Sequence, residues 1–432
     1  MSKLYKDYVK GSTSLGASFG VLTLLSRWVS IIMLIYISEM LIKYGLLGII
    51  GYILTSALAF ILFGFIAGTT QIKYPTFDTI GDIIHQKTNG ISHRLMMHII
   101  LFASFGALLI QAFGIHIMLE VLFPIPIAIS QALFYLACFI YAGLGGLKRI
   151  LKLEPLKVTI IFSSIILIPV YFFIQQGIES VYAGVRLYHP YLLYWKNHDS
   201  ISFIATSFLI TFGMLMIDRV SWQRISIMQK RKARATFSLT GMILGTIPLA
   251  LLSMALISLS NKSFDYAGTI FFELVSLLQT PVLTILFITF CIVVATSTVG
   301  AEIHATTVLI VNNVIHQKAK TSDHTKYKQS YLIVAIILFV LWLVSLISPE
   351  NIFQIIFLFG ILYSAMIAPM LFVIYSKTGI YPLSVYGIFI ASCTGVLIFL
   401  SGSYLTAIWI SFLISVAVSF LSHFKEHRKS IS

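Results

Sequence analysis

The chain has 432 residues, of which 58% are hydrophobic and only 10% charged, and its formal net charge is +14. Apolar runs of about 20 residues recur along its whole length, and each is long enough to cross a bilayer about 30 Å thick. This composition excludes a soluble globular protein and predicts an all-α polytopic membrane protein. The three cysteines lie in separate apolar segments without disulfide or metal-ligand spacing, which indicates small buried residues.

Twelve apolar segments are predicted as membrane helices. In chain order they span residues 18–41, 46–68, 93–118, 126–146, 156–176, 201–217, 237–258, 281–308, 329–347, 352–375, 382–400 and 403–422. The connections between them are short, so we expect no soluble domain. Residues 1–432 are therefore predicted to form a single transmembrane domain, and its function must be built between the helices.

Basic residues are distributed unevenly between the two sides of this arrangement. Most of the 29 lysines and arginines fall in the N-terminal segment, in the connections that follow even-numbered helices, or after the last helix. The positive-inside rule then predicts cytoplasmic N- and C-termini for a multi-pass protein of the cell membrane. This basic excess would face anionic lipid heads, so no nucleic-acid partner is needed to explain it.

Three junctions between helices have distinctive sequences. Residues 141–157 are YAGLGGLKRILKLEPLK, residues 218–234 are DRVSWQRISIMQKRKAR, and residues 296–313 are TSTVGAEIHATTVLIVNN. They resemble, in that order, three parts of the sodium:solute symporter family: a Gly-Gly turn with the following helix start, the segment after the sixth core helix, and the eighth core helix. Residues 76–87 add a fainter match to a loop of that family.

The resemblance implies a LeuT-type fold, with ten core helices in two inverted five-helix repeats and broken first and sixth helices around a midplane site. The core repeats would span about 15–176 and 201–376, and two peripheral helices about 380–422. Gly213 in the sixth helix is a candidate for its break or simply a packing residue. The implied function is secondary active symport of a small organic solute into the cell by alternating access, coupled to sodium or protons.

The stretch 281–314 places several hydroxyls, an acid and an imidazole in a membrane helix. Such hydroxyls can simply bond back to a carbonyl one turn earlier, whereas ionisable groups at that depth usually face a cavity or the bundle interior. Ser297 and Thr298 follow Val294 by three and four residues and so share one helix face with it.

The resemblance implies a sodium site in this region. A hard cation favours several neutral oxygens, and hydroxyls and backbone carbonyls supply them. Carried over from the family, the site consists of Ser26, Val29, Val294, Ser297 and Thr298. Sodium is expected as a possible coupling ion, and no other cofactor is predicted.

The first helix departs from the family pattern, because residues 24–34, LLSRWVSIIML, contain Arg27 and no glycine or proline. A charged arginine at a helix centre costs about 2.5 to 3.5 kcal/mol on insertion scales. Arg27 therefore either extends to lipid heads or water, or replaces a coupling cation, or binds a substrate carboxylate in bidentate fashion. Trp28 and Ser30 flank the same segment as further substrate-binding candidates.

Four ionisable residues are candidates for gating or coupling: Glu154, Asp218, Glu302 and His304. Glu154 stands where the family usually has Asp, although a carboxylate near a helix N-terminus is favourable in any protein. Glu302 and His304 are two residues apart and point in different directions, so each is either a proton relay or a satisfied interior group. The basic residues after Asp218 suit a solvated surface or a helix on anionic lipid.

The alternative function is a transporter-like membrane sensor that binds a small ligand and signals through a partner docked on the basic segment after Asp218. A membrane enzyme ranks third, because the sequence contains no catalytic constellation. The expected partners are a small organic solute, a coupling cation and the bilayer. A carboxylate-bearing or zwitterionic solute is suggested by Arg27 alone, and the sequence indicates no oligomeric state.

Overall fold

The computed structural model describes residues 3–11, 14–88, 90–195, 197–261, 267–315, 322–347, 352–376 and 380–429, and it is built from helices. Helices are the expected elements, because a chain inside a bilayer must satisfy its backbone hydrogen bonds within each segment. In chain order they are α1 (Lys3–Lys10), α2 (Ala17–Trp28), α3 (Ile31–Lys73), α4 (Ile80–Lys87), α5 (Gly90–Leu122), α6 (Ile127–Cys138), η1 (Phe139–Gly143), α7 (Gly146–Gln176), α8 (Ile178–Tyr188), η2 (Pro190–Leu193), α9 (His198–Ile217), α10 (Arg219–Ile227), α11 (Ala233–Leu244), α12 (Thr246–Asn261), α13 (Ile270–Glu273), η3 (Leu274–Leu277), α14 (Pro281–Leu309), η4 (Ile310–Ile315), α15 (Asp323–Ser345), α16 (Ile352–Tyr375), α17 (Pro382–Leu400) and α18 (Tyr404–Lys429).

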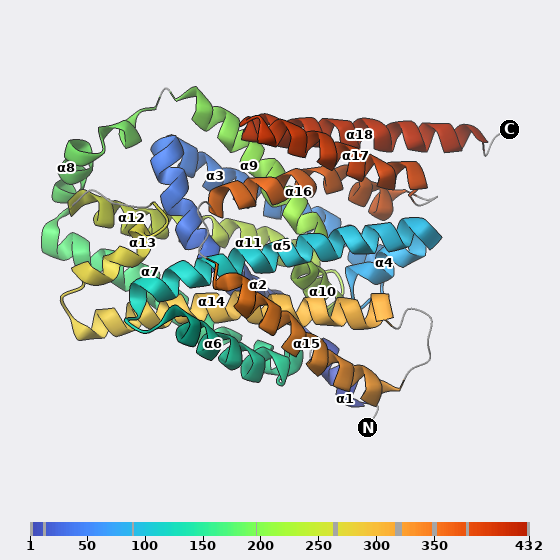
Figure 1. The fold of residues 1–432 in the computed structure, drawn as a ribbon, viewed down its shortest axis with the longest axis horizontal. Helices are drawn as coiled ribbons and strands as arrows, with labels where there is room; N and C mark the ends of the chain where they lie inside the picture. Colours follow the sequence, from blue (N-terminus) through green and yellow to red (C-terminus); the bar gives the residue numbers. More distant parts are fainter. Residues whose placement is uncertain are drawn as a thin grey trace.

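Within this described part, ten helices are long and apolar enough to cross a membrane. α3 accounts for two of the predicted spans, because Gly45 interrupts it, and the shorter apolar pair α6 and η1 takes the position of the predicted fourth span. Each of the twelve predicted spans therefore has a counterpart. α1 and the end of α18 lie at the same end of the bundle (Figure 1), as an even number of crossings requires.

The first predicted helix is broken near its middle. α2 ends at Trp28, Val29 and Ser30 are extended, and α3 begins at Ile31. No glycine or proline causes this break. The Ser30 hydroxyl accepts a hydrogen bond from the Met33 amide at 3.2 Å and so caps the new helix start.

The sixth predicted helix is also broken, but not at Gly213. α9 ends at Ile217, and Asp218 is extended and accepts a hydrogen bond from the Ser221 amide at 2.8 Å, which starts α10. Gly213 lies inside α9, where an added Cβ would be 2.2 Å from the Tyr363 carbonyl oxygen. Gly213 is therefore a packing residue, and the interpretation of it as the break is wrong.

α10 is buried, which corrects the expectation of a wholly exposed basic surface after Asp218. Arg219 and Arg224 in α10 are 5% and 0% exposed, whereas Lys230 and Arg231 beyond it are exposed. α10 packs against α2 and α14. Only the end of the basic segment lies on the surface.

Two turns need glycine. Gly45 has φ +65°, and an added Cβ would lie 3.0 Å from the Leu192 carbonyl oxygen. Gly146, in the predicted Gly-Gly turn, has φ +60°, and an added Cβ would lie 2.6 Å from the Tyr8 ring. Both positions combine a left-handed backbone with close packing, so a side chain would be strained at either.

The last two helices lie at the edge of the bundle. α17 packs mainly on α18 and α16, and α18 packs on α16 and α9. Figure 1 shows them, in red, along one side of the molecule.

The two breaks lie together in the interior, because α14 and α10 both pack against α2.

Candidate functional site

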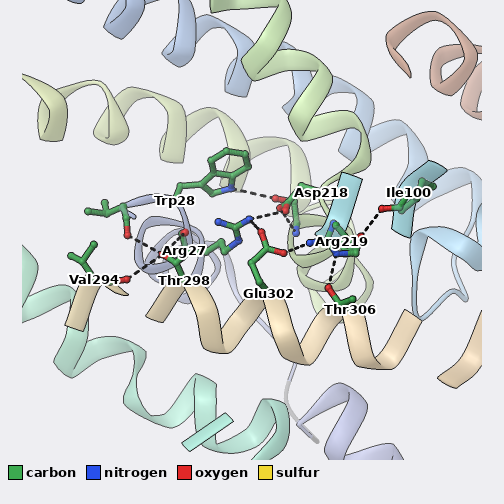
Figure 2. A network of polar contacts seen from close by, with 12 residues as sticks. Arg27, Trp28, Ile100, Asp218, Arg219, Val294, Thr298, Glu302 and Thr306 are labelled. Carbon is green, nitrogen blue, oxygen red and sulfur yellow. Dashed lines mark hydrogen bonds and ion pairs between the residues drawn. The ribbon is translucent and has the colours of Figure 1, made fainter. Parts of the chain in front are cut away.

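The break after α2 brings backbone carbonyls to a hydroxyl of α14. The last carbonyls of a helix have no partner inside it, so they are available to other groups. Thr298 Oγ1 lies 3.4 Å from the carbonyl oxygens of both Arg27 and Val29 and 3.2 Å from that of Val294. Figure 2 shows Thr298 beside Val294 and Arg27.

A second pair of hydroxyls lies next to this group. Ser26 Oγ and Ser297 Oγ are 2.5 Å apart, and both side chains are buried. All five residues expected at the cation site therefore have an atom in one of these two groups, but Ser26 contributes its hydroxyl where its carbonyl was expected, and the carbonyl beside Thr298 is that of Arg27. Their oxygens are neutral carbonyls and hydroxyls, the ligand type that a hard cation binds.

Arg27 sends its guanidinium away from these oxygens and into a charged network. Its Nη2 donates to Asp218 Oδ1 at 3.0 Å and also to Glu302 Oε1. Arg219 Nη2 donates to Glu302 Oε2, and its Nε donates to Thr306 Oγ1 at 3.0 Å. Figure 2 shows the two arginines on either side of Glu302.

The network is buried and electrically balanced. Arg27, Asp218, Arg219 and Glu302 are each at most 5% exposed at the side chain, and two positive charges face two negative ones. The interpretation that Arg27 extends to lipid heads or water is therefore wrong. Because these residues come from α2, the α9–α10 break, α10 and α14, the network ties both breaks to α14.

A cavity of about 130 Å³ lies beside the break in the first span. Trp28 and Ser30, expected to bind substrate, line it, and so does Arg27. The rest of the lining comes from α3, α5, α9, α11, α12 and α16, and it includes Gln111, which sequence reasoning missed. A lone glutamine in an apolar membrane helix is the signal that could have identified it, because polar residues there are costly and often functional.

Glu154 has its own ion-pair partner, and its carboxyl lies beside Ser26 of the candidate cation site. It is 1% exposed, and its Oε1 is 3.7 Å from Nη2 of Arg224, which is fully buried. This second ion pair joins α7 to α10. Sequence reasoning placed Arg224 on a surface and so missed the pair.

His304 contacts the N-terminal helix. Its Nε2 lies 2.9 Å from the Tyr8 carbonyl oxygen, and its ring packs at 4.9 Å from the Tyr8 ring. Glu302, two residues earlier, joins the Arg27 network instead. The two side chains thus have separate partners, as their spacing predicts.

The chain matches no family model and no curated protein sequence. Solved structures share its fold. A Na⁺-coupled sialic acid symporter in a substrate-bound outward-open state has a TM-score of 0.80 at 14% identity, over 97% of this chain and 93% of that one. Mhp1, a nucleobase-cation-symport-1 family transporter in a closed conformation with bromovinylhydantoin bound, has a TM-score of 0.62 at 12% identity, over 97% of this chain and 94% of that one.

MhsT in complex with L-phenylalanine has a TM-score of 0.57 at 14% identity, over 92% of this chain and 98% of that one. At such identities the likeness establishes the fold. The predicted fold class is therefore confirmed, and this multi-pass membrane protein has the LeuT-type fold of these three structures.

Proposed function

We propose that the protein is a secondary active transporter that moves a small solute across the cell membrane together with sodium. The observation that supports this most strongly is the group of neutral oxygens where α2 ends against α14, with Thr298 Oγ1 within 3.4 Å of three carbonyl oxygens. The first of the three solved structures is named as a Na⁺-coupled symporter, which agrees with the proposal.

The broken segment couples the ion to the solute. The Val29 carbonyl faces Thr298, while the neighbouring Trp28 and Ser30 line the cavity. An ion that orders residues 27–30 therefore also orders part of the solute site. By linkage, each ligand then raises the affinity for the other.

The ion also acts on α2. Bound between the end of α2 and Thr298, it holds α2 against α14, beside the contacts that Arg27 makes with Glu302. Release of the ion removes one of these attachments. Alternating access then consists of α2 and α10 moving relative to α14.

Sodium is preferred over a proton as the coupling ion. The oxygens at Thr298 belong to carbonyls and hydroxyls, which do not titrate, and Arg27 directs its charge to Asp218 and Glu302 instead of to these oxygens. The hypothesis that Arg27 replaces a coupling cation has no support in this geometry.

The termini are proposed to be cytoplasmic. The exposed Lys230 and Arg231 follow Met228, which pairs with Leu15 of the N-terminal segment. Exposed basic residues thus gather at the end of the bundle that holds α1. The sensor alternative relied on the basic segment after Asp218 as a docking surface, and Arg219 and Arg224 of that segment are buried.

The test is uptake into proteoliposomes. A radiolabelled compound that stabilises the purified protein in sodium chloride is offered to vesicles with an inward sodium gradient or with choline in place of sodium. We expect accumulation only with the gradient. Binding without accumulation under any gradient would favour the sensor.

Two matched threonine variants test the proposed ion site. Thr298→Val removes the hydroxyl among the three carbonyls and is expected to abolish sodium-driven accumulation. Thr296→Val is the control, because Thr296 Oγ1 bonds to the carbonyl of Ile292 at 2.8 Å within α14. Equal accumulation by both variants would disprove the assigned ion site.

A further inference from the structure

The solute cavity has no free charge for an anion. Among the described residues that line it, Arg27 is the only one with a charged side chain. Its Nη2 already donates to both Asp218 and Glu302, and Arg219 shares Glu302. The network beside the cavity is therefore neutral before any solute enters.

This balance disfavours a carboxylate-bearing solute. Moving a carboxylate from water into an apolar site without a compensating charge costs several kcal/mol. Arg27 Nε has no hydrogen-bond partner among the described residues, but the charge of Arg27 is already matched by Asp218 and Glu302. A carboxylate bound to Arg27 would therefore add a buried negative charge without a compensating positive one. An uncharged solute avoids this cost.

The polar groups of the cavity differ in whether they are already engaged. The Ser30 hydroxyl accepts from the Met33 amide, and the Ser207 hydroxyl donates to the Ile204 carbonyl at 2.8 Å. Gln111 Oε1 and Ser56 Oγ have no hydrogen-bond partner among the described residues, and Gln111 is 6% exposed. The Ser56 hydroxyl can donate or accept, whereas Gln111 Oε1 can only accept. A buried acceptor left unpaired is costly, so a bound solute that supplies an N–H or O–H group gains a bond that the empty cavity lacks.

The aromatic side chains that line the cavity favour a solute with an aromatic ring. Trp28 and Phe60 both line the cavity, and their ring centroids are 4.9 Å apart with the planes at 81°. Tyr36, Tyr52 and Tyr363 add further aromatic surface. The volume of about 130 Å³ is close to that of an engineered protein cavity, about 150 Å³, that holds one benzene ring.

We propose that the cavity binds an uncharged aromatic solute of about one ring that donates a hydrogen bond to Gln111, as a carboxamide does. This inference rests on the proposed function, because it identifies the cavity as the solute site. It replaces the expectation of a carboxylate on Arg27, and it follows from the partners that Arg27 has in the structure.

The test compares matched compounds that differ in charge. The purified full-length protein is heated with benzamide, benzoate, phenylacetamide or phenylacetate, each in sodium chloride and in choline chloride. Stabilisation follows ligand concentration over Kd, and compounds this small are expected to bind with about millimolar Kd. We expect at least one of the two amides to raise the unfolding midpoint, and neither carboxylate to do so.

A variant of Gln111 tests whether the amides bind in this cavity. Gln111→Met keeps the side-chain length but removes the acceptor, and it is expected to weaken amide binding about tenfold. Gln175→Met, at an exposed position of α7, is the control and should bind as the wild type does. Equal amide binding by Gln111→Met and the wild type would overturn the proposal.

The other outcomes separate the solute class from the coupling. Stabilisation by a carboxylate, or by none of the four compounds, overturns the proposed solute class. If a carboxylate stabilises the protein only in sodium, the class is wrong while sodium coupling stands. If an amide stabilises it equally in sodium and choline through Gln111, the class stands while sodium coupling is contradicted.

Discussion

The two broken spans have the same local design but different chemistry at the break. Ser30 caps the second half of the first span, and Asp218 caps the second half of the sixth. At the first break the cap is neutral, and the nearby carbonyls face the hydroxyl of Thr298. At the second break the cap is a carboxylate, and its other oxygen accepts from Arg27.

Under the proposed function, the ion site and the structural charge lie at different breaks. The first break presents uncharged oxygens, which suit a cation that must bind and leave. The second break contributes a permanent charge to a buried network that joins α2, α10 and α14. The first break is therefore expected to govern binding, and the second to govern stability.

The largest loss of unfolding free energy is expected for Glu302→Gln. This change leaves Arg27 and Arg219 facing a single carboxylate, that of Asp218, and breaking a buried ion pair costs about 3 kcal/mol or more. Denaturant titration in detergent measures the loss. Glu179→Gln, at an exposed position of α8, is the matched control and should change the free energy of unfolding little.

A smaller effect is expected when only the charge of the second break is removed. Asp218→Asn keeps a good helix cap but loses a charged acceptor of Arg27, at a cost of about 2 kcal/mol. Ser30→Ala loses only a cap, at about 1 kcal/mol. The same titration compares them, and a larger loss for Ser30→Ala would contradict the division of roles between the breaks.

The smallest losses of unfolding free energy are expected for substitution of the tryptophan near each break. Trp222 Nε1 donates to the Met216 carbonyl in the last turn of α9 at 2.9 Å, so Trp222→Phe should cost about 1 kcal/mol of unfolding free energy. Trp28 Nε1 reaches Ser221 Oγ only at 3.4 Å, so Trp28→Phe should cost less. Because Trp28 lines the cavity, its variant should instead alter solute binding.

Much of the fold could be predicted from the sequence. Hydropathy located every span, and the resemblance implied the two breaks. The position of the second break was missed because glycine was taken as its signal. Serine and aspartate are preferred helix caps, so Ser30 and Asp218 could have indicated both breaks.

The five residues of the candidate cation site could be named in advance because the family resemblance supplied both helices, although Ser26 and Ser297 are 271 positions apart. The resemblance supplied no partner for Arg27, so the charged network could not be predicted. Arg27 and Asp218 are separated by 191 positions, and Arg27 and Glu302 by 275. Nothing in the sequence near Arg27 indicates a carboxylate partner, so its charge suggested a substrate anion instead of an internal pair.

Direct binding of radiolabelled sodium to the purified protein tests the proposed ion site between the first break and α14. We predict saturable binding to the wild type and to Thr296→Val, and its loss in Thr298→Val, whose unfolding midpoint in sodium-free buffer should stay close to that of the wild type. Loss of sodium binding with the fold intact would establish that the break in the first span and α14 form the ion site. Absence of saturable binding to the wild type, or equal binding by Thr298→Val, would disprove a sodium site at Thr298.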